Sequence, residues 1–511
     1  MIEISGAALS KLDRSDDRYR ELRDAHPRIA AKDSTLWGPA AAAEAAHRLN
    51  WVELDETSRQ LLPILDALTA KFRGERDLVL CGMGGSSLAP EVIARTFSRP
   101  IFILDSTDPD YISNALQGDP KKLLVIVSSK SGSTIETASQ RTFFVDYLEK
   151  AGLNPTAHMI MVTDPDSPLD VSARKSGFTV VNADPQVGGR FSALTAFGLT
   201  PAALMGIDVS VLLDQASDCK NQLLTQPEVA IDVAYLILTQ AEQFLAFTDA
   251  GSAYPGLSDW IEQLIAESTG KAERGRLPVV TQGFSEAQSA GVFCISFAPG
   301  AQLVVSGELG EQFLFWEWVS ALLCVALKVD PFNQPNVTEA KVATATILRE
   351  WKNELPVLQP ESTVGEVEIF GAGNTIRAAL KNLMAMTDAD GYIAIMAYLD
   401  RRNNLDITQL RTILSDKSGR PVSFGWGPRF LHSTGQFHKG GQQNGSFLQI
   451  TGVASENYLI PDSGLDFRTL LMAQVLGDAQ ALSARKYPLL RLNLLNRSAG
   501  ISEILNAAKA L

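Results

Sequence analysis

The chain has 511 residues, which is too many for one hydrophobic core and indicates two or three domains. Hydrophobic residues make up 45% of it and charged residues 20%, the proportions of an ordinary globular protein. Its formal net charge of −13 argues against a nucleic-acid partner, because such a partner requires a basic excess to neutralise its phosphates. A single anionic substrate remains compatible with this charge, since backbone dipoles and a few cations can hold one phosphate.

Cysteine usage and the polar start of the chain predict a cytoplasmic protein without a metal centre. The four cysteines are scattered and show no metal-ligand spacing: Cys81, Cys219, Cys294 and Cys324. Met1-Ile2-Glu3 leads into polar sequence, so we expect no signal peptide. The most apolar stretch, Phe313 to Val329, contains Glu317 and Lys328 and is therefore predicted to be a buried helix and not a membrane span.

Residues 1–70 are predicted to form helices with polar faces, and residues 71–208 then alternate strands with helices. Five short apolar runs mark the strands: Leu78–Cys81, Ile101–Leu104, Leu123–Val127, Met159–Val162 and Phe178–Val181. This alternation predicts a parallel sheet covered by helices on both faces. In such sheets ligands bind at the carboxyl ends of the strands.

A second α/β domain is predicted over residues 209–350. It begins with a helical stretch from Val209 to about Phe247, and strands follow at Pro278–Val280, Val292–Phe297 and Leu303–Val305, before the buried helix. Residues 351–366 are rich in proline and glutamate and are expected to form a linker or surface loop. In the rest of the segment 351–511, three predicted strands either complete the second sheet or stand alone: Tyr392–Leu399, Val422–Trp426 and Phe447–Thr451.

Two polar turns follow strands of the first predicted sheet. Gly82-Met83-Gly84-Gly85-Ser86-Ser87 follows the first run, and Ser128-Ser129-Lys130-Ser131-Gly132-Ser133-Thr134 follows the third. A strand–turn–helix of this kind directs backbone N–H groups and a helix dipole at one point, which suits a phosphate. Helix capping explains one or two of the hydroxyls in the second turn, but four of them favour an anion pocket. The glycines are weaker evidence, because tight turns also need them.

Arg190 and Glu267 are candidate catalytic residues, although each has a simpler interpretation. In Val187-Gly188-Gly189-Arg190-Phe191-Ser192 the two glycines allow a tight fold that directs the guanidinium inward, where it would match an oxyanion or an enediolate. Taken alone, this arginine would more simply form a surface salt bridge. Glu267 lies at the end of an amphipathic helix; most such glutamates are solvated charges, and a general base requires partial burial.

Histidine is scarce, and two of the five histidines lie in one glycine-rich segment. The five are His26, His47, His158, His432 and His438. His432 follows an apolar strand and begins the polar stretch His432-Ser433-Thr434-Gly435-Gln436, where it would serve either as a proton shuttle or as a structural residue.

Together and in this order, the motifs resemble those of glucose-6-phosphate isomerases. The resemblance covers roughly residues 75–345. It is carried by Gly82–Ser86, the Ser-Lys-Ser-Gly-Ser-Thr turn with Glu136-Thr137, Val-Gly-Gly-Arg-Phe-Ser, Glu-Ser-Thr-Gly-Lys at 267–271, and Phe332-Asn333-Gln334-Pro335-Asn336-Val337 ending at Lys341. The residues 31–37 and the segment from His432 to Gly441 look most like the isomerase half of bifunctional transaldolase/glucose-6-phosphate isomerases, and the transaldolase half would then be absent from this chain.

The resemblance implies an α/β fold with two SIS-type, doubly wound parallel-sheet domains at 71–208 and 209–350. A helical segment at 1–70 would precede them, and an additional α/β segment at 351–511 would follow, alone or as part of the second domain.

The resemblance also implies a role for each matching residue. The turn containing Ser129, Lys130, Ser131, Ser133 and Thr134 would hold the substrate phosphate, and Gly84, Gly85 and Ser86 would line the sugar. Arg190 would stabilise the enediolate, and Glu267 would move the proton between C2 and C1. Lys341 would assist near the ring oxygen or hydroxyls.

The chain departs from the family pattern in two places. Thr338 stands where the family has a glutamate, with Glu339 one position later. The family's ring-opening histidine is missing from the stretch 285–290, so His432 is interpreted as its displaced substitute.

These observations predict a cytoplasmic aldose–ketose isomerase that interconverts glucose 6-phosphate and fructose 6-phosphate through a cis-enediolate. No metal or organic cofactor is expected, and the predicted partners are the sugar phosphate and a second copy of the chain, with no nucleic acid and no membrane. A bifunctional phosphoglucose/phosphomannose isomerase is one alternative. A non-catalytic SIS-domain sugar-phosphate sensor is another, but such sensors typically lack the glutamate, arginine and lysine constellation.

Overall fold

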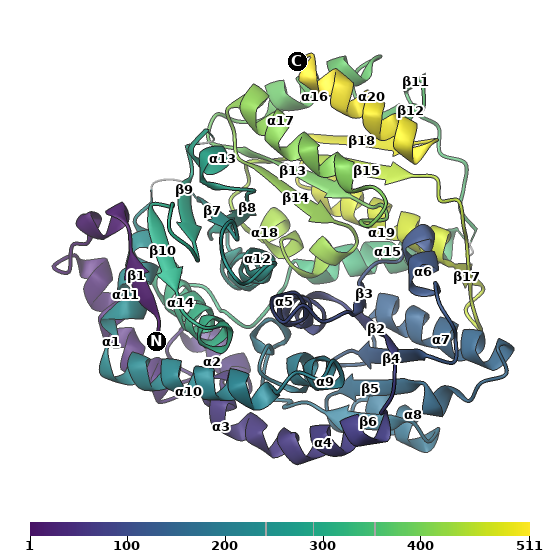
Figure 1. Ribbon diagram of the computed structural model, residues 1–511. Coiled ribbons are helices and arrows are strands. Elements are labelled where there is room, and N and C mark those ends of the chain that lie inside the picture. The colour runs from purple at the N-terminus through teal and green to yellow at the C-terminus, as the bar shows by residue number, and fades with distance from the viewer. Residues whose placement is uncertain (241–242, 290, 352–353) are drawn as a thin grey trace. The chain divides into compact units, whose positions relative to one another are not determined.

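The computed structural model describes residues 1–240, 243–289, 291–351 and 354–511 (Figure 1). Three predicted segments extend beyond these ranges: residues 241–242 of the helical stretch expected up to about residue 247, residue 290 of the stretch 285–290, and residues 352–353 of the expected linker. The chain divides into two compact units. Unit 1 comprises residues 1–105, 118–284 and 293–333, and unit 2 comprises residues 106–117, 285–292 and 334–511.

The first sheet of unit 1 has five parallel strands in the order β3-β2-β4-β5-β6. They are β2 (Asp77–Gly82), β3 (Phe102–Leu104), β4 (Leu123–Ser128), β5 (Met159–Thr163) and β6 (Thr179–Asn182). Each coincides with one of the five predicted apolar runs. The chain passes from β2 outward to β3 and then builds β4, β5 and β6 in the opposite direction, so the strand order reverses between β2 and β4. A doubly wound sheet has a ligand-binding crevice at this point.

The second sheet of unit 1 has the order β1-β10-β9-β7-β8, with β1 antiparallel at one edge and the other strands parallel. Its strands are β1 (Glu3–Ser5), β7 (Phe244–Thr248), β8 (Leu277–Val280), β9 (Phe293–Ser296) and β10 (Leu303–Ser306). The expectation of helix up to residue 247 is wrong at its end, because Phe244–Thr248 is a strand. Its apolar run follows an apolar helix closely, and periodicity alone does not separate a buried strand from a buried helix.

Helices cover both faces of the first sheet (Figure 1). Since the crossover direction changes at the strand reversal, α5 and α9 lie on one face and α7 and α8 on the other. The helices of unit 1 are α1 (Asp17–Ala30), α2 (Pro39–Ala45), α3 (Leu54–Thr57), α4 (Leu62–Lys71), α5 (Leu88–Thr96), α7 (Ile135–Lys150), α8 (Pro168–Lys175), α9 (Ala196–Leu204), α10 (Val209–Thr225), α11 (Glu228–Leu238), α12 (Leu257–Thr269) and α14 (Leu309–Leu327).

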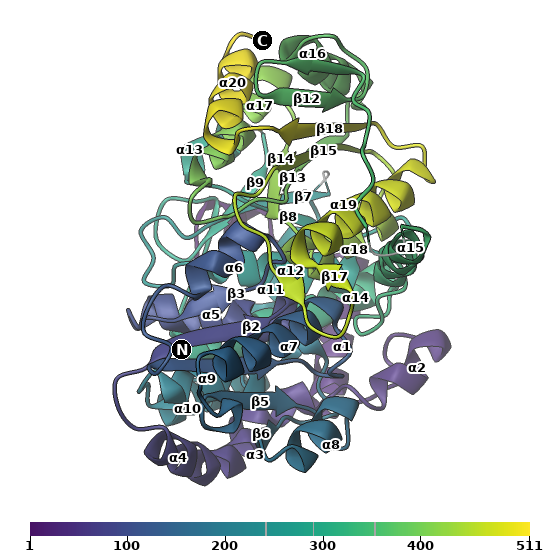
Figure 2. The same cartoon turned by 90° about the vertical axis from the view of Figure 1, so that its right-hand side faces the viewer.

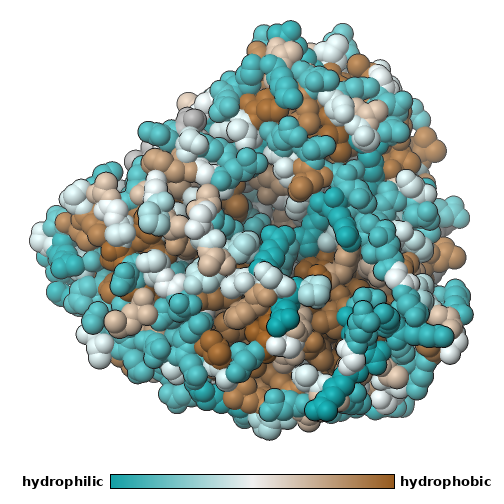
Figure 3. Space-filling model, viewed as in Figure 1, coloured by the Kyte–Doolittle hydropathy of each residue, from teal (hydrophilic) through white to brown (hydrophobic). Residues whose placement is uncertain are grey.

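The apolar helix α14 lies inside unit 1, as predicted. It is long and apolar enough to cross a membrane, but 94% of its most apolar window is buried within the fold, where it packs against α10, α11 and α12. It therefore serves as the central core helix of this unit. On the face drawn in Figure 3, hydrophobic residues occur in several patches separated by hydrophilic ones.

Glu317 is an exception within this core helix. Its side chain is fully buried, and neither carboxyl oxygen has a hydrogen-bond partner among the described residues. Burial raises the pKa of this carboxyl well above its usual value of 4.5. The folded chain therefore keeps a proton that the unfolded chain loses above about pH 4.5.

Glu317→Gln is expected to make the stability of the protein less dependent on pH. In the wild type, stability should fall as the pH rises from the unfolded-state pKa toward the raised folded-state pKa, by at most about 1.4 kcal/mol per pH unit for one proton. The glutamine variant should lose this slope and be the more stable protein at pH 8. Thermal unfolding midpoints at pH 5.5 and 8 measure the effect, with Glu149→Gln on the exposed face of α7 as control. Identical pH slopes in wild type and variant would contradict it.

Unit 2 is built around a third sheet of six strands in the order β11-β12-β18-β15-β13-β14. The strands β14, β13, β15 and β18 are parallel, and β12 and β11 continue the sheet in antiparallel fashion. The bounds are β11 (Ser362–Val364), β12 (Val367–Phe370), β13 (Tyr392–Ala397), β14 (Val422–Trp426), β15 (Gly445–Gly452) and β18 (Leu489–Leu494), with a separate pair β16 (Leu459–Ile460) and β17 (Leu465–Asp466). The C-terminal strands thus form a sheet of their own, which decides the alternative that the sequence left open.

The helices of unit 2 cover both faces of this sheet (Figure 2). They are α6 (Pro109–Ala115), α13 (Phe284–Ser289, with all but its first residue in this unit), α15 (Val337–Glu350), α16 (Ile376–Met386), α17 (Gln409–Ser418), α18 (Gly435–Gly440), α19 (Phe467–Ser483) and α20 (Arg497–Lys509). Helix α20 contacts both α16 and α17 on one face, and α19 packs against β18 on the other.

Candidate functional site

The glycine turn after β2 lies directly against the glycine turn that precedes Arg190. Gly84 has a φ of 57°, a left-handed conformation that glycine adopts without strain. A Cβ atom at Gly85 would lie 1.9 Å from the carbonyl oxygen of Gly189, so only glycine allows the two backbones to approach this closely. The predicted sugar-lining residues Gly84, Gly85 and Ser86 therefore form a short 3-10 turn beside Arg190.

The hydroxyl turn after β4 leads directly into the N-terminus of α7. Thr134 is the N-cap residue, but its side chain makes no capping hydrogen bond. Ser131 and Ser133 are exposed, and their Oγ atoms lie 2.7 Å apart, while the Ser129 Oγ accepts a hydrogen bond from the N–H of Gly132. Helix capping by Thr134 therefore does not explain this turn. Four hydroxyl-bearing residues at the N-terminus of a sixteen-residue helix form a suitable anion site.

The two turns lie at the crevice of the first sheet, because β2 and β4 are the neighbouring strands between which the strand order reverses. Lys130 forms an ion pair with Asp164, the residue after β5, at 2.6 Å. Burial is the largest influence on both groups: it lowers the pKa of the Lys130 ammonium and raises the pKa of the Asp164 carboxyl. The Lys130 ammonium is thus already paired with a carboxylate that follows a strand of the same sheet.

Arg190 and Glu267 form a buried ion pair within unit 1. Arg190 Nη1 lies 2.9 Å from Glu267 Oε1, and the two side chains are only 5% and 7% exposed. The second carboxylate oxygen, Oε2, accepts a hydrogen bond of 3.1 Å from Gln263 Nε2. The burial that a general base requires, which the sequence could not establish for Glu267, is present in the structure. It arises because α12 is buried almost all round, so its last turn lies inside the unit.

The guanidinium of Arg190 is held on its other side by backbone carbonyls. Its Nη2 donates hydrogen bonds to the carbonyl oxygens of Phe332 at 2.8 Å and Asn333 at 3.1 Å. The structure thus brings together three predicted motifs: the Gly-Gly-Arg turn, the Glu-Ser-Thr-Gly-Lys segment and the first residues of the Phe-Asn-Gln turn.

Three residues of this arrangement were missing from the sequence-based site. Gln263 lies one helical turn before Glu267, a spacing that would have indicated contact once the helix was recognised. Lys271 ends the Glu-Ser-Thr-Gly-Lys motif, and its ammonium donates to the carbonyl oxygen of Asp330. Burial lowers the pKa of Lys271 to about 7, and repulsion from Arg190 contributes further. No local pattern marked Asp330, whose role depends on its turn.

His432 and Lys341 belong to unit 2 and are described within it. His432 is partly exposed in a short 3-10 turn, and Lys341 is exposed on α15. Their segments are joined by a reciprocal amide pair: Gln436 Nε2 donates to Asn336 Oδ1 at 2.8 Å, and the N–H of Asn336 donates to Gln436 Oε1 at 3.1 Å. The roles predicted for His432 and Lys341 remain predictions.

A buried ion pair anchors the helix that follows His432. Lys439 Nζ on α18 lies 2.6 Å from Asp478 Oδ1 on α19, and both side chains are almost completely buried. Such a pair is costly to break, because removal of either partner leaves an uncompensated charge in the core. It therefore fixes the position of the segment that carries His432 within unit 2.

Unit 2 also has a hollow at the carboxyl ends of β13, β15 and β18, with a volume of about 550 Å³. Arg497, which lines it, forms ion pairs with Asp108 and Asp110, and Asp110 accepts hydrogen bonds from the N–H groups of Ser455 and Glu456. These groups are thus engaged in joining α6 to the edge of the sheet.

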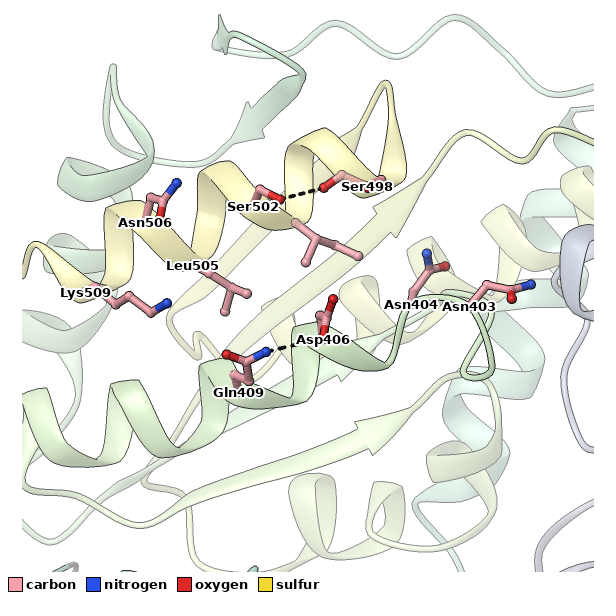
Figure 4. A pocket seen from close by; sticks show the side chains of 10 residues that line it. Asn403, Asn404, Asp406, Gln409, Ser498, Ser502, Leu505, Asn506 and Lys509 are labelled. Atoms are coloured by element: carbon pink, nitrogen blue, oxygen red, sulfur yellow. Dashed lines mark hydrogen bonds between the residues drawn. The ribbon is translucent and has the colours of Figure 1, made fainter.

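A smaller groove of about 350 Å³ lies beside it, between α20 and the start of α17 (Figure 4). It is lined mainly by amide and hydroxyl side chains, with Leu505 of α20 directed toward Gln409. None of the predicted site residues lines this groove, so the Arg190–Glu267 arrangement in unit 1 remains the candidate active site.

Comparisons with known proteins match the same part of the chain. Residues 67–274 match the sequence model of the phosphoglucose isomerase family, a range that contains both polar turns, Arg190 and Glu267. A glucose-6-phosphate isomerase of Thermus thermophilus is 32% identical over 262 residues, which cover 50% of this chain and 61% of the relative. One of Carboxydothermus hydrogenoformans is 28% identical over 357 residues, covering 62% of this chain and 74% of the relative.

The chain therefore spans about three fifths of the length of the Thermus relative. Among solved structures, a glucose-6-phosphate isomerase of Chlamydia trachomatis superposes with a TM-score of 0.53 at 20% identity, over 70% of this chain and 89% of that one. This likeness confirms the predicted α/β fold with doubly wound parallel sheets. The chain is thus similar to glucose-6-phosphate isomerases, and its residues 67–274 match the phosphoglucose isomerase model.

Proposed function

We propose that the chain catalyses the reversible isomerisation of glucose 6-phosphate and fructose 6-phosphate. The observation that carries the proposal is the buried Arg190–Glu267 ion pair, which offers one substrate both a base and a cation. The same unit contains the two polar turns that follow β2 and β4, where the strand order reverses. The names of the relatives supply the substrate class. Buried charged side chains in such a location are typical of active sites.

The reaction requires one proton to move between adjacent carbons. Glu267 takes the proton from C2 of the open-chain aldose, and the electrons of that bond form the C1–C2 double bond as negative charge develops on O1. Arg190 stabilises this enediolate by its fixed positive charge and its N–H donors. The proton then returns to C1 and the O2 hydroxyl proton moves to O1, which gives the ketose.

A coupled assay of purified chain with fructose 6-phosphate tests the proposal directly. Formation of glucose 6-phosphate, followed through an NADP-linked dehydrogenase, is the expected result. Turnover of mannose 6-phosphate in a matched assay would identify the bifunctional phosphoglucose/phosphomannose isomerase. Binding of sugar phosphates without any turnover would instead favour a sensor.

The phosphate site is tested by Ser131→Ala combined with Thr134→Ala. Hydrogen bonds to a charged group contribute roughly 1.5–3 kcal/mol each, so loss of two should raise KM for fructose 6-phosphate by about 100-fold or more. Steady-state kinetics measure this, and Thr142→Ala on the same helix is the control, since its hydroxyl only donates to a backbone carbonyl. An unchanged KM would place the phosphate elsewhere.

The role of His432 is tested by His432→Ala on two kinds of substrate. A group that only transfers protons to the ring oxygen has no task when the ring is already open. The variant should therefore lose far more turnover on the cyclic sugar phosphate than on an open-chain analogue, while His47→Ala, at an exposed position, should behave as wild type. Equal losses on both substrates would argue against ring opening. Wild-type behaviour would leave Lys341 as the next candidate.

We further propose that the enzyme works without a metal or organic cofactor, in the cytoplasm, and as a homodimer. The acidic composition and scattered cysteines support the cytoplasmic, cofactor-free part of this proposal. Activity after dialysis against a chelator tests the cofactor requirement, and the mass in solution from light scattering tests the dimer.

A further inference from the structure

The orientation of the Arg190 guanidinium depends on one turn of the chain. Both carbonyl groups that accept hydrogen bonds from its Nη2 belong to the residues 330–333, which follow α14. Its Nη1 faces Glu267 Oε1 at 2.9 Å. Because a guanidinium is planar and rigid, a shift of these two carbonyls would move Nη1 away from the carboxylate.

Asp330 shapes this turn through its side chain. Its Oδ1 accepts hydrogen bonds from the backbone N–H groups of Phe332 at 2.8 Å and Asn333 at 3.3 Å. Aspartate side chains commonly stabilise a turn in this way, by taking the place of a backbone acceptor. The two residues whose N–H groups are fixed by Asp330 are the same two whose carbonyls hold Arg190.

Lys271 stabilises the turn 330–333 through the backbone of the same aspartate. Its Nζ donates to the backbone carbonyl of Asp330, and the side chain is only 5% exposed. Burial and repulsion from Arg190 lower the pKa of this ammonium to about 7, whereas Cys324, Asp330 and Glu267 act in the opposite direction. A buried cation placed on a neutral carbonyl, close to another cation, is unfavourable by itself. Its effect on the geometry of the turn accounts for the arrangement.

We propose that Lys271 and Asp330 are positioning residues, which hold the turn 330–333 in the shape that fixes Arg190 beside Glu267. This inference rests on the isomerase function proposed above. Neither residue needs to contact the substrate. The expected consequence of disturbing them is a loss of turnover, because a displacement of about 1 Å at a reacting centre can reduce a rate by about 100-fold.

Asp330→Ala and Asp330→Asn form the matched pair that tests the side chain. Asparagine keeps an Oδ1 acceptor for the two N–H groups, whereas alanine removes it. Asp330→Ala should lower kcat by about 10- to 100-fold, with KM changed much less, while Asp330→Asn should stay within a few fold of wild type. A merely structural role would lower the unfolding temperature in Asp330→Ala without this split between kcat and KM.

Lys271→Met tests the contribution of Lys271 to the turn. Lys122→Met is the matched control, since Lys122 is a half-exposed residue that directly precedes β4. The methionine keeps the length of the side chain but cannot donate to Asp330, so kcat should again fall while Lys122→Met behaves as wild type. Should Lys271→Met fail to fold, the Asp330 pair decides, since that residue lies on a partly exposed turn.

A crystal structure of Asp330→Ala provides a readout that does not depend on activity. We expect Arg190 Nη1 to move away from Glu267 Oε1 and the carbonyls of the turn to rotate. An unmoved Arg190, together with wild-type kcat in both Asp330→Ala and Lys271→Met, would overturn the positioning role. Lack of isomerase activity in the wild type, with Arg190 displaced in the variant, would instead refute the proposed function and leave the structural coupling intact.

Discussion

Glu267→Gln is expected to abolish isomerisation while substrate binding survives. Glutamine preserves the shape of the side chain and can still accept from Gln263, but it cannot take a proton from C2. General acid–base catalysis contributes about 10²- to 10⁴-fold, so kcat should fall by at least that range. The coupled assay measures kcat, and calorimetric titration with an unreactive sugar-phosphate analogue measures binding.

Asp259→Asn is a suitable control for this experiment. It makes the same carboxylate-to-amide change in the first turn of α12, the helix that ends with Glu267. Near-normal turnover in Glu267→Gln would end the mechanism proposed here. Loss of both binding and thermal stability would show that the buried carboxylate serves the fold.

Arg190→Lys is expected to be nearly as harmful, although it keeps the positive charge. The guanidinium reaches Glu267 through Nη1 and two carbonyls through Nη2 at the same time, and one ammonium cannot reproduce this fork. Removal of a donor that stabilises a developing oxyanion typically costs about 10²- to 10³-fold in kcat. Steady-state kinetics should show this loss, while Arg174→Lys, at a half-exposed arginine paired with Asp170, should leave kcat unchanged.

We expect the buried Arg190–Glu267 pair to affect the free energy of unfolding as well, and this effect can be measured separately from catalysis. Arg190→Met alone leaves the Glu267 carboxylate buried without a cation, which costs about 3–5 kcal/mol in comparable pairs. The double variant Arg190→Met, Glu267→Gln removes that charge and should recover most of the lost stability, but no activity. Equal stability of the single and double variants would show that the ion pair contributes little to folding.

Local sequence patterns were sufficient for the elements that depend on neighbouring residues. The five strands of the first sheet were predicted because each is a short apolar run between helical patterns, and such a run is buried on both faces of a parallel sheet. The core position of α14 was predicted because two charges interrupt its apolar stretch. The pattern failed at β7, where a short buried strand closely follows a largely apolar, buried helix.

The sequence by itself also determined which residues could hold an anion or a proton, since hydroxyl-rich turns, a glycine-flanked arginine and a glutamate in a motif can be recognised without coordinates. Only the tertiary structure decided how they are arranged. The burial of Glu267, its pairing with Arg190 and the support from Asp330 join residues 190, 267 and 330, which are far apart in the chain. Their proximity depends on how two sheets and the helices between them pack within unit 1, and that packing is a long-range property which no local window of sequence contains.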